Sequence, residues 1–187
     1  MRTLGHALRG VRPGPIGLAG SRLSGFLPYS LSVSSEAFGD GRPMPVRFTQ
    51  DGDNLCPPLR WDGLPAGTQS CVLLVEDADI PSFRPVVHLI VHSLAPDVTE
   101  LAEGEVPLRL VGHSPRGYAC GRNFLGRPGW TAPSPPPGHG PHRYAFQVFA
   151  LGARLDFPYP PGRALLLRTM HPHLLGQGRL IGTYERA

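Results

Sequence analysis

Hydrophobic residues occur in short runs separated by loops rich in glycine and proline, which is the pattern of a β protein rather than a helical one. The near-continuous apolar runs at 71–77 (CVLLVED) and 86–94 (VVHLIVHSL) predict strands that are covered on both faces. A third strong strand is predicted at 142–151 (HRYAFQVFAL). We expect these three strands to form the centre of the fold.

Weaker signals predict the remaining elements. A first strand is expected at 31–39, a short strand at the start of 46–65 before a turn-rich loop, and a final strand at 179–186. The one fair helix pattern runs over 162–178. Pro172 should break or kink this helix near His171, because proline lacks a backbone N–H.

The order of these elements favours a mainly β, two-sheet antiparallel fold with a few short peripheral helices, since strands do not alternate with helices as they do in parallel α/β folds. The 187 residues suffice for one domain with a substantial core, and the hydrophobic content of 41% argues against disorder. No apolar run approaches the roughly 18 residues that span a membrane, so we expect no stable membrane insertion.

Positive charge is concentrated near the N-terminus. All 18 basic residues are arginine, and residues 1–47 carry six of them against two acids, whereas the remainder has twelve of each sign. A balanced body lacks the basic face that nucleic-acid binding needs, so we expect no nucleic-acid partner. We divide the chain into a basic N-terminal arm, 1–29, with a short helix near Leu4–Arg9, and a domain at 30–187. The Arg-rich start of the arm also fits a cleaved organellar transit peptide, and this alternative stays open.

The cysteines indicate a reducing compartment. Cys56, Cys71 and Cys120 are odd in number, widely spaced and form no C-x-x-C motif. Such spacing is typical of free thiols rather than of a disulfide framework, and it predicts a cytoplasmic location.

Polar residues that could carry chemistry stand in or at the ends of the apolar strands. Asp77 and Asp79 follow the strand at 71–77 in the turn EDADIP, where acids either close a turn through their own backbone or face a ligand. His88 is embedded in an otherwise apolar strand, and strict alternation places it on one face with His92. A histidine in such a position is either a hydrogen-bonded core residue or part of a binding site.

A second group of polar residues surrounds a proline-rich segment. PSPPPG (133–138) cannot form a helix or a central strand, so it predicts a stiff, shaped loop of the kind that often carries binding residues. GPHRY (140–144) follows at the start of the third strong strand. Alternation directs His142 and Tyr144 to one face and Arg143 to the other.

Together these motifs form a specific ordered combination. The segments 51–81 (DGDNLCPPLRWDGLPAGTQSCVLLVEDADIP), 86–91 (VVHLIV) and 129–151 (GWTAPSPPPGHGPHRYAFQVFAL) resemble the phosphatidylethanolamine-binding protein family, which includes the Raf kinase inhibitor proteins. The chain looks like a bacterial-type member. The resemblance extends from about Ser30 to Glu185, which implies a domain of that family at 30–187.

The resemblance implies a small anion pocket. Carried over residue by residue, it assigns the pocket lining to Asp77, His88, His142 and Tyr144, the adjoining acidic loop to Asp79 and Pro81, and a backbone N–H to Ser134. The sequence departs from the family pattern in two places. Ala78 replaces the first proline of the family motif D-P-D-x-P, which loosens the turn, and Pro172 alters the C-terminal helix near the end that helps gate the pocket in the family.

The chemistry of these residue types supports the same pocket. Imidazoles donate hydrogen bonds and carry positive charge when protonated, which suits a phosphate group. Asp77 is expected to accept a hydrogen bond from one histidine and fix its tautomer, while Tyr144 adds a neutral donor. Arg143 is expected to act as a structural support that holds Asp79 in a bidentate contact.

The leading interpretation is a non-enzymatic binding protein, without a cofactor, for small anionic or phosphorylated ligands such as a phospholipid headgroup or a phosphorylated side chain. The resemblance also implies regulation of a kinase or a protease, and a homodimer is left open. The alternative is a metal-dependent hydrolase that uses Asp77, His88 and His142 as ligands. A serine hydrolase built on Ser134 is disfavoured, because the G-x-S-x-G motif is missing.

Overall fold

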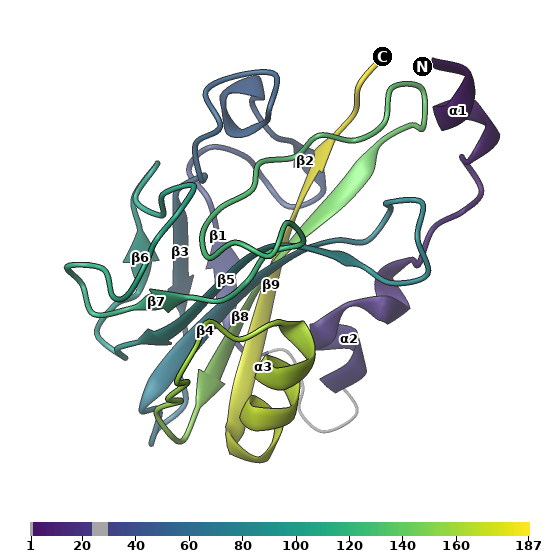
Figure 1. The fold of residues 1–187 in the computed structure, drawn as a ribbon. Helices are drawn as coiled ribbons and strands as arrows, with labels where there is room; N and C mark the ends of the chain where they lie inside the picture. The colour runs from purple at the N-terminus through teal and green to yellow at the C-terminus, as the bar shows by residue number, and fades with distance from the viewer. Residues whose placement is uncertain (1, 24–29) are drawn as a thin grey trace.

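Two β sheets with short helices around them make up the computed structural model, which describes residues 2–23 and 30–187 (Figure 1). The larger sheet has the order β2-β9-β8-β4-β5-β7 in this part of the chain. Its strands are β2 (Arg42–Pro43), β9 (Leu174–Tyr184), β8 (His142–Leu151), β4 (Ser70–Asp77), β5 (Val86–Leu94) and β7 (Ala119–Cys120). The smaller sheet consists of β1 (Ser32–Ser34), β3 (Leu59–Asp62) and β6 (Glu100–Leu101).

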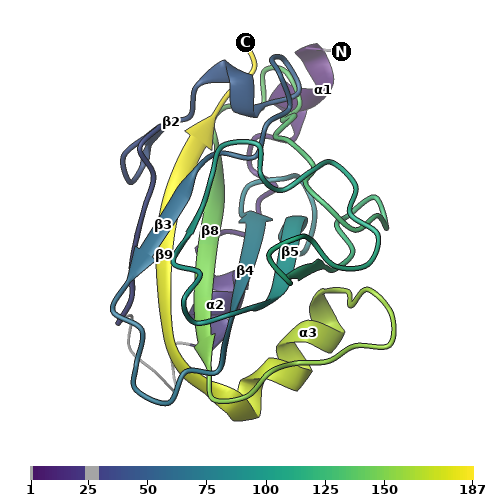
Figure 2. The same ribbon diagram turned by 90° about the vertical axis from the view of Figure 1, so that its left-hand side faces the viewer.

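The helices are short. They are α1 (Arg2–Ala7), α2 (Ala19–Leu23) and α3 (Arg163–Met170), with the 3-10 helices η1 (Pro15–Gly17), η2 (Val46–Phe48) and η3 (His171–His173). In Figure 2, α2 and α3 lie on one side of the large sheet and β3 lies on the other. No helix in the described ranges is both long and apolar enough to cross a lipid bilayer.

Hydrophobic side chains alternate between two cores because the central strands are covered on both faces. All eight residues of β4 are buried. Leu73 and Val75 face the core between the two sheets, which also contains Trp61, whereas Leu74 faces the core beneath α3 with Leu166. The predicted covering of this strand on both faces is therefore confirmed, and the mainly β, two-sheet architecture with a few short helices is confirmed with it.

The central strands match the sequence-based expectation closely, while the peripheral elements do not. The strands predicted at 71–77, 86–94 and 142–151 are β4, β5 and β8. The last strand is longer than predicted, and only three residues of 31–39 form a strand. Residues 46–48 form a 3-10 helix rather than a strand. Pro45 restricts the backbone at its start, and its carbonyl accepts the N–H of Phe48. β2 pairs parallel to β9, unlike the other strand pairs described.

The predicted helix at 162–178 ends early. α3 stops at Met170, and Pro172 lies within η3 directly after it, as its missing N–H requires. The chain then enters β9, so residues that the sequence pattern assigned to the helix are strand residues.

A bulge in β5 overturns one expectation about the histidines. Val75 pairs with Leu89 but Glu76 pairs with Val87, so His88 is an extra residue in β5. A bulge interrupts the alternation of side chains. The ring of His88 consequently contacts Trp130 on the inter-sheet side, whereas His92 contacts Phe157 on the α3 side. The prediction that His88 and His92 share a face is wrong for this reason.

The described part of the N-terminal arm, residues 2–23, is packed on the domain. The helix predicted near Leu4–Arg9 is present as α1, while α2 was not predicted. Glu76 and Gln147, both fully buried on the large sheet, accept the backbone N–H groups of Ala19 and Gly20 at 2.8 and 2.7 Å. The predicted boundary after residue 29 lies outside the described residues.

Candidate ligand-binding site

The candidate site lies at one end of the large sheet, where β4 finishes and β8 begins. Asp77 is the last residue of β4 and pairs with Tyr144 near the start of β8. Antiparallel pairing brings these ends together, and both side chains point to the inter-sheet side, as does His142. The bulge turns His88 to the same side. Residues from three strands, β4, β5 and β8, therefore meet at one place.

Asp77 organises the turn that follows β4. Its Oδ1 accepts the backbone N–H groups of Asp79 at 2.7 Å and Ile80 at 3.1 Å, which is the self-closing turn that the sequence left as one of two alternatives. Its Oδ2 lies 2.7 Å from Nδ1 of His142. The turn is thus held by the carboxylate even though Ala78 replaces the expected proline.

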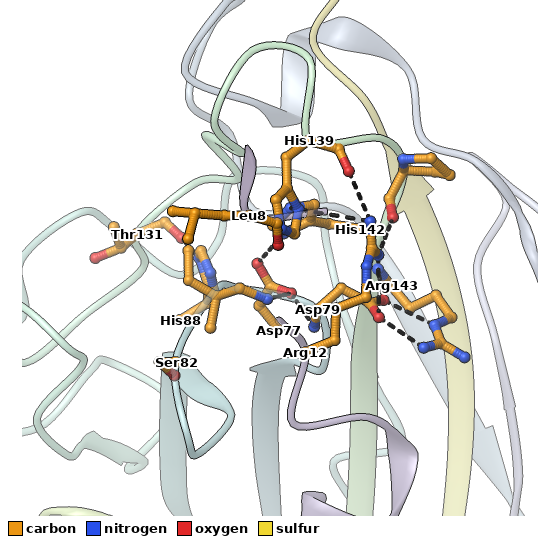
Figure 3. Close-up of polar contacts among 12 residues, drawn as sticks. Leu8, Arg12, Asp77, Asp79, Ser82, His88, Thr131, His139, His142 and Arg143 are labelled. Atoms are coloured by element: carbon orange, nitrogen blue, oxygen red, sulfur yellow. Dashed lines mark hydrogen bonds and ion pairs between the residues drawn. The ribbon is translucent and has the colours of Figure 1, made fainter. Parts of the chain in front are cut away.

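His142 has a protein partner at each ring nitrogen. Besides the contact with Asp77, its Nε2 lies 2.8 Å from Nδ1 of His139. His139 in turn places Nε2 2.8 Å from the carbonyl oxygen of Leu8 in the N-terminal arm. Figure 3 shows this row of groups running from the arm across His139 and His142 towards Asp77. His139 and His142 are both fully buried.

Asp79 is held by two arginines. Its Oδ2 accepts from the backbone N–H and from Nε of Arg143, and its Oδ1 accepts from Nη2 of Arg143 at 2.6 Å. Nη1 of Arg12 lies 3.2 Å from the same Oδ1. These contacts hold the pKa of Asp79 below its usual value despite burial. The predicted bidentate contact between Arg143 and Asp79 is present (Figure 3).

A cavity of about 200 Å³ lies beside Asp77. Its lining residues are Asp77, Ile80, Val86, His88, Phe124, Ala132, Ser134 and Tyr144. The hydroxyl of Tyr144 is fully buried and has no hydrogen-bond partner among the residues that the structure describes. Burial raises the pKa of Tyr144, so the hydroxyl keeps its proton and remains a donor.

His88 presents one ring nitrogen to a fixed partner. Its Nδ1 lies 2.6 Å from the carbonyl oxygen of Thr131, so Nδ1 carries the proton that this bond requires. Burial lowers the pKa of His88, partly offset by the charge of Asp77. The imidazole is therefore neutral near pH 7, and its Nε2 is an acceptor. His88 therefore lacks, at this pH, the positive charge that would suit a phosphate group best.

The predicted site residues divide into three groups in space. Asp77, His88, Tyr144 and Ser134 line the cavity. His142 lies next to it, with its ring stacked on Tyr144 at 6.4 Å between centroids. Asp79, Pro81 and Arg143 do not line it, and Asp79 braces the loop instead.

Several residues of the site had no clear sequence signal. Phe124 contributes a half-exposed ring to the cavity, and His139 and Leu8 extend the contacts of His142. His139 could have been found from its spacing, because Gly140 and Pro141 separate it from His142 in a tight turn. The Ser134 hydroxyl accepts from Nη1 of Arg186 at 2.6 Å, a contact between distant parts of the chain.

The alternative of a metal centre has no support in the arrangement of side chains. Within residues 2–23 and 30–187, no three His, Cys, Asp or Glu side chains are grouped closely enough to hold a metal ion. Asp77 and His142 direct Oδ2 and Nδ1 at each other, which uses the atoms that a shared metal would need.

Comparison with known proteins identifies the family. The family model for phosphatidylethanolamine-binding proteins matches residues 34–185, which is most of the chain. The chain belongs to the phosphatidylethanolamine-binding protein family. Two UPF0098 proteins of archaea are similar to it. That of Methanothermobacter thermautotrophicus is 38% identical over 156 residues, covering 83% of this chain and 99% of the relative. That of Pyrococcus horikoshii is 38% identical over 157 residues, covering 84% and 77%.

Solved structures agree with this membership. Escherichia coli YbcL, described as a member of the mammalian phosphatidylethanolamine-binding protein family, superposes with a TM-score of 0.77 at 26% identity over 84% of this chain and 99% of that one. Chlamydia trachomatis CT736 gives 0.75 at 33% identity with the same coverage. The match to the family model begins only at residue 34, so the N-terminal arm that contacts His139 lies outside it.

Proposed function

We propose that this member of the phosphatidylethanolamine-binding protein family is a non-enzymatic binding protein, and that the cavity beside Asp77 takes the phosphate-containing end of a small ligand. The observation that carries the proposal is the buried Tyr144 hydroxyl, which has no partner in the described structure and belongs to a residue that lines the cavity with His88. An unsatisfied buried hydroxyl costs about 1–3 kcal/mol, so a ligand oxygen that accepts its proton would recover that energy.

Size and lining restrict the ligand. About 200 Å³ accommodates a headgroup-sized molecule rather than a large cofactor. Ile80, Val86, Phe124 and Ala132 supply apolar walls, and the polar part of the lining comes from Asp77, His88, Ser134 and Tyr144. The Asp77 carboxylate is already engaged by the turn and by His142, which leaves Tyr144 and His88 as the main groups that can contact a ligand. A phospholipid headgroup and a phosphorylated side chain share the phosphate group that these contacts suit.

The direct test is titration of the protein with inorganic phosphate and with phosphorylethanolamine, followed by calorimetry and by the ring signals of His88. We expect both to bind and to shift His88. Tyr144→Phe should weaken binding by about tenfold, since it removes one hydrogen bond in a buried site. His92→Gln, on the opposite face of the sheet, is the matched control and should bind normally. Unchanged His88 signals at millimolar ligand would refute the proposal.

The pH dependence of binding gives a second test. An anion in the cavity favours the protonated form of His88, whose pKa is lowered by burial in the free protein. The complex should therefore take up a proton, and phosphate affinity should rise as the pH falls below neutral. His88→Gln should remove most of this dependence. Phosphate itself ionises between about pH 6 and 7, so its own contribution is subtracted from both curves. A slope that survives this correction in His88→Gln would show that another group of the protein supplies the charge.

Regulation of a kinase or a protease, homodimer formation and a cytoplasmic location remain predictions from the sequence. For the kinase or protease partner, phosphate binding is the useful first result, because a partner that presents a phosphorylated side chain would compete with phosphorylethanolamine. Competition distinguishes a partner that binds at the cavity from one that binds elsewhere.

A further inference from the structure

The N-terminal arm is connected to the site through hydrogen bonds whose donors and acceptors determine which ring nitrogens of His139 and His142 carry protons. The carbonyl oxygen of Leu8 can only accept, so Nε2 of His139, 2.8 Å away, must carry a proton. Burial lowers the pKa of His139, and the hydrogen bond to the Leu8 carbonyl offsets this only in part, so the ring is neutral near pH 7 and its Nδ1 carries no proton. Nη2 of Arg12, a donor, lies 3.5 Å from that Nδ1, in agreement with this assignment.

The same reasoning fixes the protons of His142. Because Nδ1 of His139 is an acceptor, Nε2 of His142, 2.8 Å away, must donate to it. On the other side, Asp77 accepts two backbone N–H groups at Oδ1, which favours the carboxylate form. Its Oδ2 then accepts from Nδ1 of His142 at 2.7 Å. Both ring nitrogens of His142 therefore carry protons.

We propose that the N-terminal arm is a positioning element for the site: through the Leu8 carbonyl and His139 it holds His142 as an imidazolium paired with Asp77, and this charge strengthens anion binding in the adjoining cavity. The ring of His142 lies 6.4 Å from that of Tyr144, with 24° between their planes. The charge therefore sits directly behind the proposed phosphate contact, where little solvent screens it.

The groups that surround the pair His139 and His142 come from several elements. They are Asp77 on β4, His88 on β5, Tyr144 on β8, and Arg12 and Leu8 in the arm. Arg12 also donates to the carbonyl oxygens of His139 and Pro141 at 2.7 and 2.8 Å, and Arg9 donates to that of Gly138. These contacts hold the loop that carries His139 against the arm.

Without the arm, the direction of the hydrogen bond between His139 and His142 would reverse. If His139 loses the Leu8 carbonyl, its proton can move from Nε2 to Nδ1, and Nδ1 then donates to Nε2 of His142. His142 must give up its own Nε2 proton to accept that bond and becomes neutral. The arm thus determines the charge of a residue in the family domain although it lies outside the family match.

Gly5 offers a way to displace the arm with one methyl group. A Cβ at Gly5 would lie 2.1 Å from the carbonyl oxygen of Pro137. This is shorter than any van der Waals contact allows, so α1 must move away from the loop. Gly10→Ala is the matched control, because a Cβ there meets nothing within 4 Å. Alanine is a better helix former than glycine, so a loss in Gly5→Ala comes from the contact rather than from helix propensity.

The experiment is a long-range ¹H–¹⁵N spectrum of the histidine rings of the full chain at pH 7, assigned with His142→Gln. In the unaltered protein and in Gly10→Ala we expect His142 to show two protonated nitrogens. In Gly5→Ala it should show one, and phosphate should bind about tenfold more weakly, as expected for the loss of one charge interaction. Arg12→Gln is a second variant for the case that Gly5→Ala does not fold. It should change the protonation of His142 and the phosphate affinity in the same direction as Gly5→Ala.

The ring spectrum is independent of the ligand, although the affinity readout rests on the proposed function. If phosphate does not bind the unaltered protein, the proposed function fails while the spectrum still decides the role of the arm. A single protonated nitrogen on His142 in the unaltered protein overturns this inference. So do two protonated nitrogens that persist in both Gly5→Ala and Arg12→Gln.

Discussion

At the scale of single residues, the side chain of Tyr144 has two opposing effects on the stability of the fold. Its side chain packs in the inter-sheet core and lines the cavity, while its buried hydroxyl has no partner in the described structure. The same side chain therefore stabilises the fold through its ring and costs stability through its hydroxyl. Such a cost is expected where a protein is built to meet a ligand.

This division gives a stability prediction for Tyr144→Phe without ligand. Removing an unpartnered buried hydroxyl should leave the free energy of unfolding unchanged or raise it by up to about 1 kcal/mol. Urea denaturation at pH 7 measures this value. Tyr118→Phe is the control, since the Tyr118 hydroxyl donates to the carbonyl oxygen of Glu105 at 3.2 Å and its loss should lower stability. A lower stability for Tyr144→Phe would mean that the hydroxyl has a partner in solution.

His92 gives a pH-dependent prediction at the same scale. Burial lowers its pKa to about 4 from the value of 6.5 expected in the unfolded chain. Between these values the unfolded chain binds a proton that the folded protein does not, so stability is full above about pH 6.5 and falls as the pH drops towards 4. The loss attributable to His92 should be on the order of 2–3 kcal/mol.

Urea denaturation at intervals from pH 7 to pH 4.5 tests this prediction. His92→Gln should show a flatter dependence than the unaltered protein, because it lacks the titrating group. His173→Gln, at an exposed position, should keep the original slope. Since His88 contributes in the same direction, the difference between the slopes is the informative quantity. Equal slopes for all three proteins would exclude His92 as the source.

At the scale of elements, the helices on the α3 side are fixed to the large sheet by one buried carboxylate. Glu76 accepts from the N–H of Ala19, from the amide of Gln147 and from Nε of Arg163. Arg163 begins α3 and also donates to the carbonyl oxygen of Gly17 at 2.8 Å. A single side chain of β4 thus connects the arm and α3.

Glu76→Gln should therefore lower the free energy of unfolding by about 2–4 kcal/mol. The substitution leaves Arg163 without its counter-ion, and the new amide NH2 group lies against N–H donors that the carboxylate accepted from. Chemical denaturation measures the loss, and amide exchange at Ala19 should become faster. Glu100→Gln removes an exposed pair with Arg60 and should cost less than about 1 kcal/mol. A cost for Glu76→Gln no larger than that of Glu100→Gln would contradict the connecting role.

The elements also show what a sequence can and cannot reveal. β4, β5 and β8 were predictable because each is a long apolar run whose composition alone demands burial. The face on which His88 lies was not, since a bulge shifts alternation by one residue and depends on pairing with β4. The 3-10 helix at Val46–Phe48 was missed because a short β-like run beside prolines fits either structure.

The candidate site was only partly predictable for a related reason. The order of motifs indicated Asp77, His88, His142 and Tyr144, since each follows or begins a strand. Nothing local in the sequence indicates that Leu8 would meet His139, because that contact joins residues 131 positions apart. The arm could be recognised from its charge but not from its role.

At the scale of the whole molecule, the three cysteines report on global opening. Cys56, Cys71 and Cys120 are free, as the sequence predicted, and all three are buried. Burial raises the pKa of Cys71 and Cys120 to about 12. A thiol needs both exposure and ionisation to react. In the native fold the three cysteines are neither exposed nor ionised at neutral pH.

We therefore expect no reaction with an aromatic disulfide reagent at pH 8 in the native protein, and reaction of all three thiols in urea. Absorbance of the released thiolate measures both. Val111→Cys, at an exposed position, is the positive control and should add one rapidly reacting thiol. Rapid reaction of a native cysteine would show that a part of the core opens locally.

Both ends of the described chain lie at the same end of the sheet as the site (Figure 1). α1 packs on the loop of Pro137, and Arg186 binds Ser134 and Asp51. A polyhistidine tag at either end would place additional imidazoles beside a site that itself depends on His88, His139 and His142. Binding and ring-nitrogen measurements are best made on protein whose tag has been removed, or on protein that carries the tag as an insertion in the exposed turn around Gly67.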